Sequence, residues 1–160
     1  MKDVDVLLIN PIDKTQLKNR LGIKAPPLNL LYLASMLEKF SRSVKIIDDN
    51  LYELGIKKVA KLVAKYNPLI VGITAVTATV KTALKYLKEI KKLLPNVITV
   101  IGGPHVSFLP TTTLRECSSL DAVVIGEGEE TIVDLVDKVE KRGERGLGEV
   151  RGSHIDMEIR

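Results

Sequence analysis

The sequence predicts an α/β domain with a doubly wound parallel sheet of five strands. Short apolar runs rich in Val and Ile recur along the chain without alternating with polar residues, as expected of parallel strands covered by helices on both faces. Segments with apolar residues at helical spacing separate these runs, and such alternation predicts right-handed crossovers and the strand order 2-1-3-4-5. The predicted strands are residues 4–9, 44–48, 69–74, 97–101 and 122–125.

The predicted helices differ in how regularly their apolar residues are spaced. The segment 80–93 is the clearest, because its apolar residues share one face and the lysines between Lys81 and Lys92 lie mostly elsewhere, which we interpret as a solvated face. Cys117 lies on an apolar helix face and is interpreted as core packing. The predicted helices are residues 28–40, entered through Pro26-Pro27, then 53–66, 80–93, 112–117 and 129–140.

Composition sets limits on the function. At 160 residues with 45% hydrophobic residues, the chain is long enough for one packed domain. Its single cysteine excludes an internal disulfide, a Cys-rich zinc site and an iron–sulfur cluster held by this chain alone. A net charge of +4 and an aromatic content of 4% do not favour a nucleic-acid partner.

The two ends of the chain carry further predictions. The charged N-terminus lacks the pattern of a secretory signal, and no apolar segment is long enough to cross a bilayer, so we expect a cytoplasmic protein without a membrane partner. Residues 1–142 are predicted to form the domain. Residues 143–160 lack apolar periodicity and are predicted to be a flexible tail, in which Gly152-Ser153-His154 resembles an expression-vector remnant.

Small residues follow several of the predicted strands. Because ligands of such sheets bind outside the carboxyl ends of the strands, these residues are candidates for a binding site, expected at the switch point between strands 1 and 3. Each has a simpler reading: an irregular loop after strand 1, a helix N-cap at Thr77 or Thr79, and tight turns at the glycines. The candidates are Asn10 and Pro11, then Thr74, Ala75, Val76 and Thr77, then Gly102, Gly103, Pro104 and His105, and finally Gly126 and Glu127.

Several binding and catalytic motifs are absent from the sequence. No G-x-G-x-x-G and no P-loop occurs, and the loop after strand 1 lacks the Ser, Thr and Gly residues of an FMN phosphate loop. The carboxylates of Glu127, Glu129 and Glu130 argue against a phosphate at the last helix, although Glu129 and Glu130 also suit its first turn. Neither Cys117 nor His105 lies in a convincing nucleophile–base context. We therefore predict no catalytic residue and no metal ligand in this chain.

Five motifs together resemble the cobalamin-binding domain that precedes the radical S-adenosylmethionine (SAM) core in a large enzyme family. The resemblance covers roughly residues 3–141 and implies a flavodoxin-like (Rossmann-like) fold. It also implies that the corrin ring lies across the carboxyl edge of the sheet, with the nucleotide tail near strands 1, 3 and 4. Thr74 to Thr77 and Gly102-Gly103 would line the tail, and Gly126-Glu127 would border the far wall. The motifs are Leu8 to Pro11, Pro26 to Ala34, Val71 to Thr74 with Thr77, Ile101 to Val106, and Val124 to Thr131.

Two departures from related patterns refine this expectation. Cobalamin-dependent mutases carry D-x-H-x-x-G after strand 1, whose His is the lower cobalt ligand, whereas residues 10–27 contain no histidine. The radical core needs C-x-x-x-C-x-x-C, and Cys117 stands alone. The resemblance thus implies a cobalamin-binding module without a protein His below cobalt. The [4Fe-4S] cluster and SAM would belong to a radical SAM domain, in cis or in trans, typically for methyl transfer. A ligand-free interaction domain and a nucleotide-binding domain remain alternatives.

Overall fold

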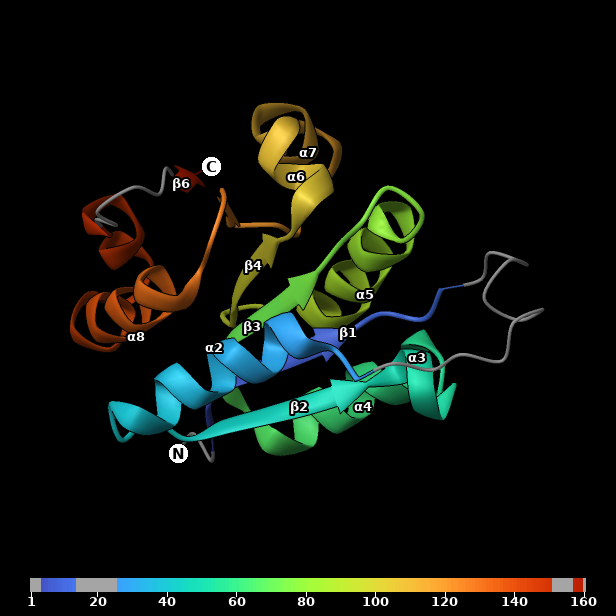
Figure 1. Ribbon diagram of the computed structural model, residues 1–160, viewed down its shortest axis with the longest axis horizontal. Coiled ribbons are helices and arrows are strands. Elements are labelled where there is room, and N and C mark those ends of the chain that lie inside the picture. Colours follow the sequence, from blue (N-terminus) through green and yellow to red (C-terminus); the bar gives the residue numbers. More distant parts are fainter. Residues whose placement is uncertain (1–3, 14–25, 151–156, 160) are drawn as a thin grey trace.

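The computed structural model describes residues 4–13, 26–150 and 157–159. Within these residues one sheet has the strand order β2-β1-β3-β4-β5-β6 (Figure 1). The pairings among the first five strands are all parallel, which confirms the predicted order 2-1-3-4-5. These strands are β1 (Val4–Asn10), β2 (Val44–Asp48), β3 (Pro68–Thr74), β4 (Ile98–Gly102) and β5 (Ala122–Val124).

Two further elements lie beyond residue 142, where the sequence pattern indicated none. The 3₁₀ helix η1 (Gly143–Glu149) buries Leu147, and β6 (Met157–Ile159) pairs antiparallel with β5. In this segment Leu147 is the one apolar residue among glycines and charged residues. One apolar residue cannot show helical periodicity, so the sequence did not predict η1. The domain boundary at 142 and the flexible tail stay predictions, and Gly152-Ser153-His154 lies outside the described residues.

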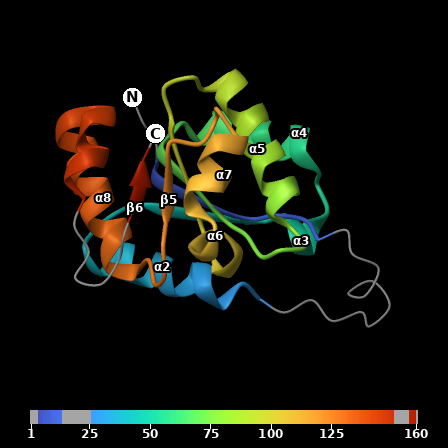
Figure 2. The same cartoon turned by 90° about the horizontal axis from the view of Figure 1, so that it is seen from above.

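Helices cover both faces of the sheet (Figure 2). Successive side chains of a strand point to opposite faces of the sheet, and both faces of β1 are apolar. Leu7 and Ile9 lie in one buried cluster, and Val6 and Leu8 lie in the other. Cys117 is buried in the first cluster, as predicted. The first cluster lies under α4 (Ile56–Tyr66), α5 (Val80–Leu93) and α7 (Pro110–Glu116), and the second under α2 (Leu28–Lys39) and α8 (Glu129–Arg142).

Short helices account for the differences from the predicted elements. The segment predicted as one helix over 53–66 follows a separate turn, α3 (Asp49–Tyr52), because Glu53 and Gly55 both have positive φ and interrupt the helix. Another short helix, α6 (Pro104–Phe108), begins where the sequence indicated only a turn after Gly103. Proline at the first helical position, where no N–H is needed, explains both α6 and the start of α7 at Pro110.

The lysine face of α5 is exposed to solvent, as its sequence pattern predicted. The side chains of Lys81, Lys85, Lys88 and Lys92 are exposed. Lys91 is partly buried and forms an ion pair with Asp121, with 2.7 Å between its Nζ and Oδ2 of the carboxylate. Among the described residues, no helix combines the length and the hydropathy needed to cross a membrane.

A buried carboxylate fixes the corner between β2 and α4. Asp49 is fully buried, and its side chain accepts hydrogen bonds from the backbone N–H groups of Leu54 (2.5 Å) and Gly55 (3.1 Å). The hydroxyl of Tyr86, on α5, donates to the same carboxylate and accepts from the N–H of Ile12 at 3.4 Å. This network therefore joins α5 to the chain that leaves β1.

We expect the Asp49–Tyr86 contact to make the protein sensitive to alkaline pH. Burial raises the pKa of the Tyr86 hydroxyl, and the hydrogen bond to Asp49 raises it further. Above the ordinary tyrosine pKa of about 10, the unfolded chain loses this proton while the folded chain keeps it, so the free energy of unfolding falls as pH rises. Urea unfolding between about pH 8 and pH 11 should show a steeper loss in the wild type than in Tyr86→Phe. An equal loss of stability with pH in the two proteins would contradict a raised pKa of Tyr86 in the folded state.

Candidate functional site

A cavity of about 420 Å³ opens on the face of the sheet that α2 and α8 cover. Its floor is the sheet itself, with Leu8 of β1, Gly72 of β3, Val100 of β4 and Val124 of β5. Leu33 of α2 and Ile132 of α8 form its apolar walls. The volume falls in the range of small-molecule binding pockets, and a mostly apolar lining with a few polar groups is typical of them.

Two glycines make the floor hollow. Gly72 pairs with Leu8 on one side and Val100 on the other, and a Cβ built on it would lie 2.8 Å from Cδ2 of Leu8. At Gly102 a Cβ would lie 3.8 Å from Cβ of Val124, an ordinary contact distance. The backbone at Gly102 therefore has room for a side chain, which the cavity would have to accommodate.

Gly103 has a different role from its neighbour. Its φ of +116° is one that other residues rarely adopt, and a Cβ there would lie 2.5 Å from the carbonyl oxygen of Ala75. The N–H of Ala75 in turn donates to the carbonyl of Gly102 at 2.8 Å. This close approach of two backbone segments holds the ends of β3 and β4 together at the cavity.

The helix α6 is tied to the opposite wall by one serine. The hydroxyl of Ser107 donates to the carbonyl of Gly103 at 3.0 Å and accepts from the N–H of Gly126 at 3.0 Å. Gly126 has positive φ (+76°), which suits the turn that leads from β5 toward α8. The loops after β4 and β5 are thus connected across the rim of the cavity.

Half of the residues predicted for the site line the cavity. Those six are Thr74, Gly102, Gly103, Pro104, Gly126 and Glu127.

The other six predicted residues do not line the cavity but lie along the same sheet edge. The side-chain amide of Asn10 donates to Asp48 of β2 at 2.8 Å, and Pro11 is buried outside the cavity lining. Ala75 packs under Gly103, and Val76 is exposed. Thr77 and His105 contact each other, with 3.1 Å between Oγ1 and Nδ1.

The cavity extends beyond the predicted position, and the predicted helix cap differs in detail. The cavity spans β1, β3, β4 and β5 on one face, so it includes the predicted switch point between β1 and β3 and continues to β5. Thr79 occupies the N-cap position of α5, but its hydroxyl accepts from the N–H of Val76 at 3.1 Å and makes no capping bond to the helix. The predicted N-cap position at Thr79 is therefore confirmed, whereas its hydroxyl does not cap the helix. The loop after strand 1, which the sequence left open as an irregular surface loop or a loop folded over a ligand, falls mostly in residues 14–25, outside the described residues.

Sequence reasoning missed the polar residues that α2 and α6 bring to the rim. The side-chain amide of Asn29 donates to the hydroxyl of Thr74 at 2.8 Å and so closes the gap between α2 and β3. Ser107 and Gly128 also line the cavity. The glycine inside the apolar run of β3, Gly72, was a usable signal, because glycine in a strand interior often marks a close approach of backbone or ligand.

The charge at the rim is negative. Glu127 and Glu129 line the cavity, and no lysine, arginine or histidine does so among the described residues. Glu129 and Glu130 stand in the first turn of α8, as predicted, where carboxylates are favourable. The rim thus suits hydrogen-bond donors such as amides and hydroxyls better than an isolated phosphate. Within the described residues, no cluster of three His, Cys, Asp or Glu side chains has the geometry of a metal site.

The comparison with protein families agrees with this geometry. The family model of the B12 binding domain matches residues 17–136. The chain belongs to the B12-binding domain family. The sequence-based resemblance to the cobalamin-binding domain of cobalamin-dependent radical SAM enzymes is thereby confirmed.

Curated relatives of this B12-binding domain include methyltransferases. An uncharacterized methyltransferase of Pyrococcus horikoshii is 45% identical over 141 residues, which are 88% of this chain and 30% of that protein. The cytidylyl-2-hydroxyethylphosphonate methyltransferase of Streptomyces wedmorensis is 31% identical over 146 residues, 80% of this chain and 27% of that protein. The chain thus spans less than a third of the length of these two relatives.

Solved structures share the fold. The radical SAM methyltransferase TsrM from Kitasatospora setae, solved with cobalamin and a [4Fe-4S] cluster bound, superimposes with a TM-score of 0.72 at 21% identity, covering 88% of this chain and 25% of TsrM. The cobalamin-dependent enzyme OxsB, solved with aqua-cobalamin, superimposes with a TM-score of 0.71 at 24% identity, covering 86% of this chain and 19% of OxsB.

Proposed function

We propose that this domain binds cobalamin with the nucleotide tail of the cofactor in the cavity between the sheet and the helices α2 and α8. The observation that carries the proposal is the glycine-floored apolar cavity at the carboxyl ends of β3, β4 and β5. A flat benzimidazole needs a slot without side chains, and Gly72 and Gly102 leave one in the floor. The corrin ring would then lie across the carboxyl edge, over Gly103 to His105 and Gly126-Glu127.

The residues at the rim fit the polar groups of cobalamin. Thr74 and Asn29 form a hydrogen-bonded pair at the mouth and offer a hydroxyl and an amide for the tail. The carboxylate of Glu127 can accept hydrogen bonds from the amides of the corrin or from a ribose hydroxyl. Ser107 holds the two rim loops together and so keeps the cavity open before the cofactor enters.

We further propose that no histidine of this chain coordinates the lower face of cobalt. The sequence holds only His105 and His154, and residues 10–27 contain none. Nδ1 of His105 is already 3.1 Å from the hydroxyl of Thr77, outside the cavity lining.

Electron paramagnetic resonance tests the lower ligand directly. We expect bound cob(II)alamin to show no nitrogen superhyperfine splitting, because the benzimidazole is in the cavity and His105 is engaged elsewhere. His105→Ala should give the same spectrum as the wild type. A nitrogen splitting that disappears in His105→Ala would identify His105 as the ligand. A splitting that persists when both His105 and His154 are replaced by alanine would place the benzimidazole on cobalt and contradict the cavity assignment.

Bound methylcobalamin would supply a methyl group for transfer. This chain would hold and orient the cofactor, whereas the cluster and SAM would be held by a radical SAM domain, in cis or in trans. Two relatives are named as methyltransferases, which supports methyl transfer as the reaction class, while other relatives are named as anaerobic magnesium-protoporphyrin IX monomethyl ester cyclases.

Uptake of hydroxocobalamin tests the proposed function. The protein is mixed with hydroxocobalamin, passed through a gel-filtration column and examined for the visible spectrum of the corrin. We expect the cofactor to elute with the protein and to raise its melting temperature, while FMN and NAD leave the melting temperature unchanged. A colourless protein peak would count against the proposal. A shift with FMN or NAD alone would favour nucleotide binding, and no shift with any of them would favour an interaction domain.

A further inference from the structure

Phe108 is the one large apolar side chain, among the described residues, that both lines the cavity and is mostly exposed. Its side chain is 85% exposed. Burying a phenylalanine side chain is favourable, so an exposed one at the mouth of an apolar cavity is a surface that a ligand can cover favourably. Other exposed aromatic residues, such as Tyr32, Phe40 and Tyr52, do not line the cavity.

The backbone around Phe108 is firmly held, so its exposure is a feature of the fold. Val106, two residues before it, is fully buried, and Ser107 bonds to both rim loops. On the other side, the carbonyl of Leu109 accepts a hydrogen bond from the hydroxyl of Thr113 at 2.7 Å. Pro104 and Pro110 set the starts of α6 and α7, so the end of α6 at Phe108 and the break at Leu109 are fixed.

We propose that Phe108 packs against the bound corrinoid at the cavity mouth and slows its release. This inference rests on the proposed function. An aromatic ring suits this position because it gives a large, flat apolar contact with little loss of side-chain entropy, and the hydrocarbon framework and methyl groups of the corrin are a matching surface. The contact forms only when the cofactor is present, so Phe108 contributes to retention of the ligand and not to folding.

The rate of cobalamin release from four proteins tests this role. Each protein is loaded with hydroxocobalamin, and release to an excess of a second cobalamin binder is followed by gel filtration and the visible spectrum. Phe108→Ala should release the cofactor about tenfold faster than the wild type. Phe108→Trp keeps an aromatic ring and should release it at a rate close to that of the wild type.

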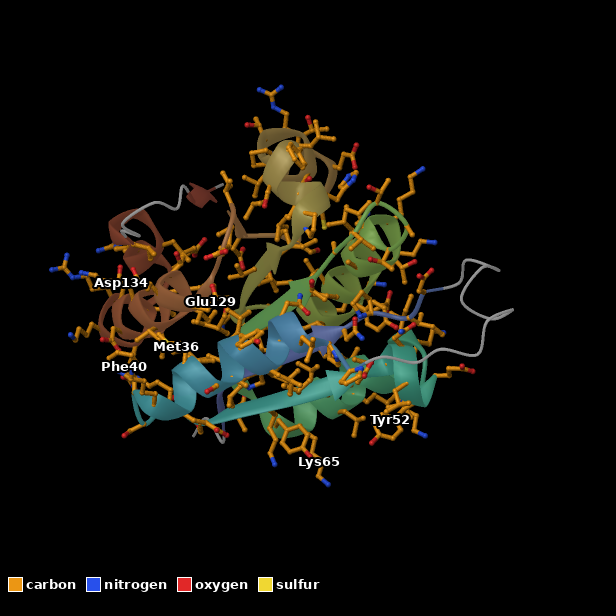
Figure 3. The ribbon with its side chains drawn as sticks, in the orientation of Figure 1. Met36, Phe40, Tyr52, Lys65, Glu129 and Asp134 are labelled. Carbon is orange, nitrogen blue, oxygen red and sulfur yellow. The ribbon has the colours of Figure 1, made fainter. Side chains whose placement is uncertain are left out.

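Phe40→Ala is the matched control. It removes the same side chain from a site that is 52% exposed at the end of α2, away from Glu129 at the cavity (Figure 3). Its release rate should equal that of the wild type. The melting temperatures of the apo forms of both Phe108 variants should also stay unchanged.

The outcomes separate the two proposals. Wild-type uptake combined with equal release from Phe108→Ala and wild type would overturn the role of Phe108 and leave the proposed function intact. Equally fast release from Phe40→Ala and Phe108→Ala would also overturn it, because the effect would not be local. A wild-type chain that takes up no cobalamin would overturn both proposals together.

Discussion

Replacement of Gly102 by valine is expected to weaken cobalamin binding by about a hundredfold or more while the protein stays folded. The backbone at Gly102 has ordinary β-strand geometry, and a Cβ there meets Val124 at a normal contact distance of 3.8 Å. The two methyl groups of valine must therefore lie in the cavity, in the volume assigned to the nucleotide tail. Equilibrium titration with hydroxocobalamin measures the affinity, and circular dichroism measures the fold.

Gly148→Val is the control for this experiment. It makes the same substitution in η1, where nothing lies within 4 Å of the added Cβ. We expect wild-type affinity from it. Gly102→Ala should fall between the wild type and Gly102→Val, because one methyl fills less of the slot than three carbons do. A Gly102→Val protein that elutes with the full corrin spectrum would show that the tail does not occupy this cavity.

The neighbouring glycine shows what the sequence alone could not distinguish. In the sequence, Gly102 and Gly103 are equivalent members of one glycine pair. In the structure, Gly103 has positive φ and lies against the backbone of Ala75, so any side chain there disrupts the turn itself. Both glycines line the cavity, but only the three-dimensional approach of β3 and β4 shows that the first leaves room for a side chain there and that the second is required by the turn.

The strands could be predicted because their signal is local. Each is a run of β-branched and aliphatic residues, and β1 buries side chains on both faces. The cavity could be predicted only in part, because the sequence shows which residues end a strand but not which face of the sheet stays open. That face depends on how α2 and α8 pack, and it brings Leu8 and Val124 into the lining and leaves Asn10 outside it.

The residues after Thr74 illustrate the same limit. Four consecutive small residues, Thr74 to Thr77, were predicted to line one slot. The N–H of Ala75 bonds to the carbonyl of Gly102, which turns the chain away from the cavity, so Thr74 alone of the four reaches it. A hydrogen bond between segments this far apart in the chain leaves no pattern in either segment.

The role of Asp49 could not be predicted from the sequence either. Its replacement is expected to lower the free energy of unfolding more than any other substitution considered. In the sequence, Asp48 and Asp49 are simply two adjacent acids at the end of a predicted strand. In the structure Asp49 is fully buried and satisfies the backbone N–H groups of Leu54 and Gly55 and the hydroxyl of Tyr86. Its alanine variant would leave these three donors without their acceptor in the protein interior.

We expect Asp49→Ala to lower the free energy of unfolding by about 3–5 kcal/mol, because each buried donor left unsatisfied costs about 1–3 kcal/mol. Asp48→Ala is the matched control. Asp48 is only partly buried and accepts hydrogen bonds from Asn10 and Leu51, so its loss should cost about 1 kcal/mol. Urea unfolding of both variants measures the difference.

A double-mutant cycle with Tyr86→Phe then locates the effect. Because the hydroxyl of Tyr86 donates to Asp49, the two substitutions should cost less together than the sum of their separate costs. Strict additivity would mean that the two side chains act independently and would contradict the buried network. If Asp49→Ala lost no more stability than Asp48→Ala, water would have to reach the donors of Leu54 and Gly55, and the corner between β2 and α4 would be open rather than sealed.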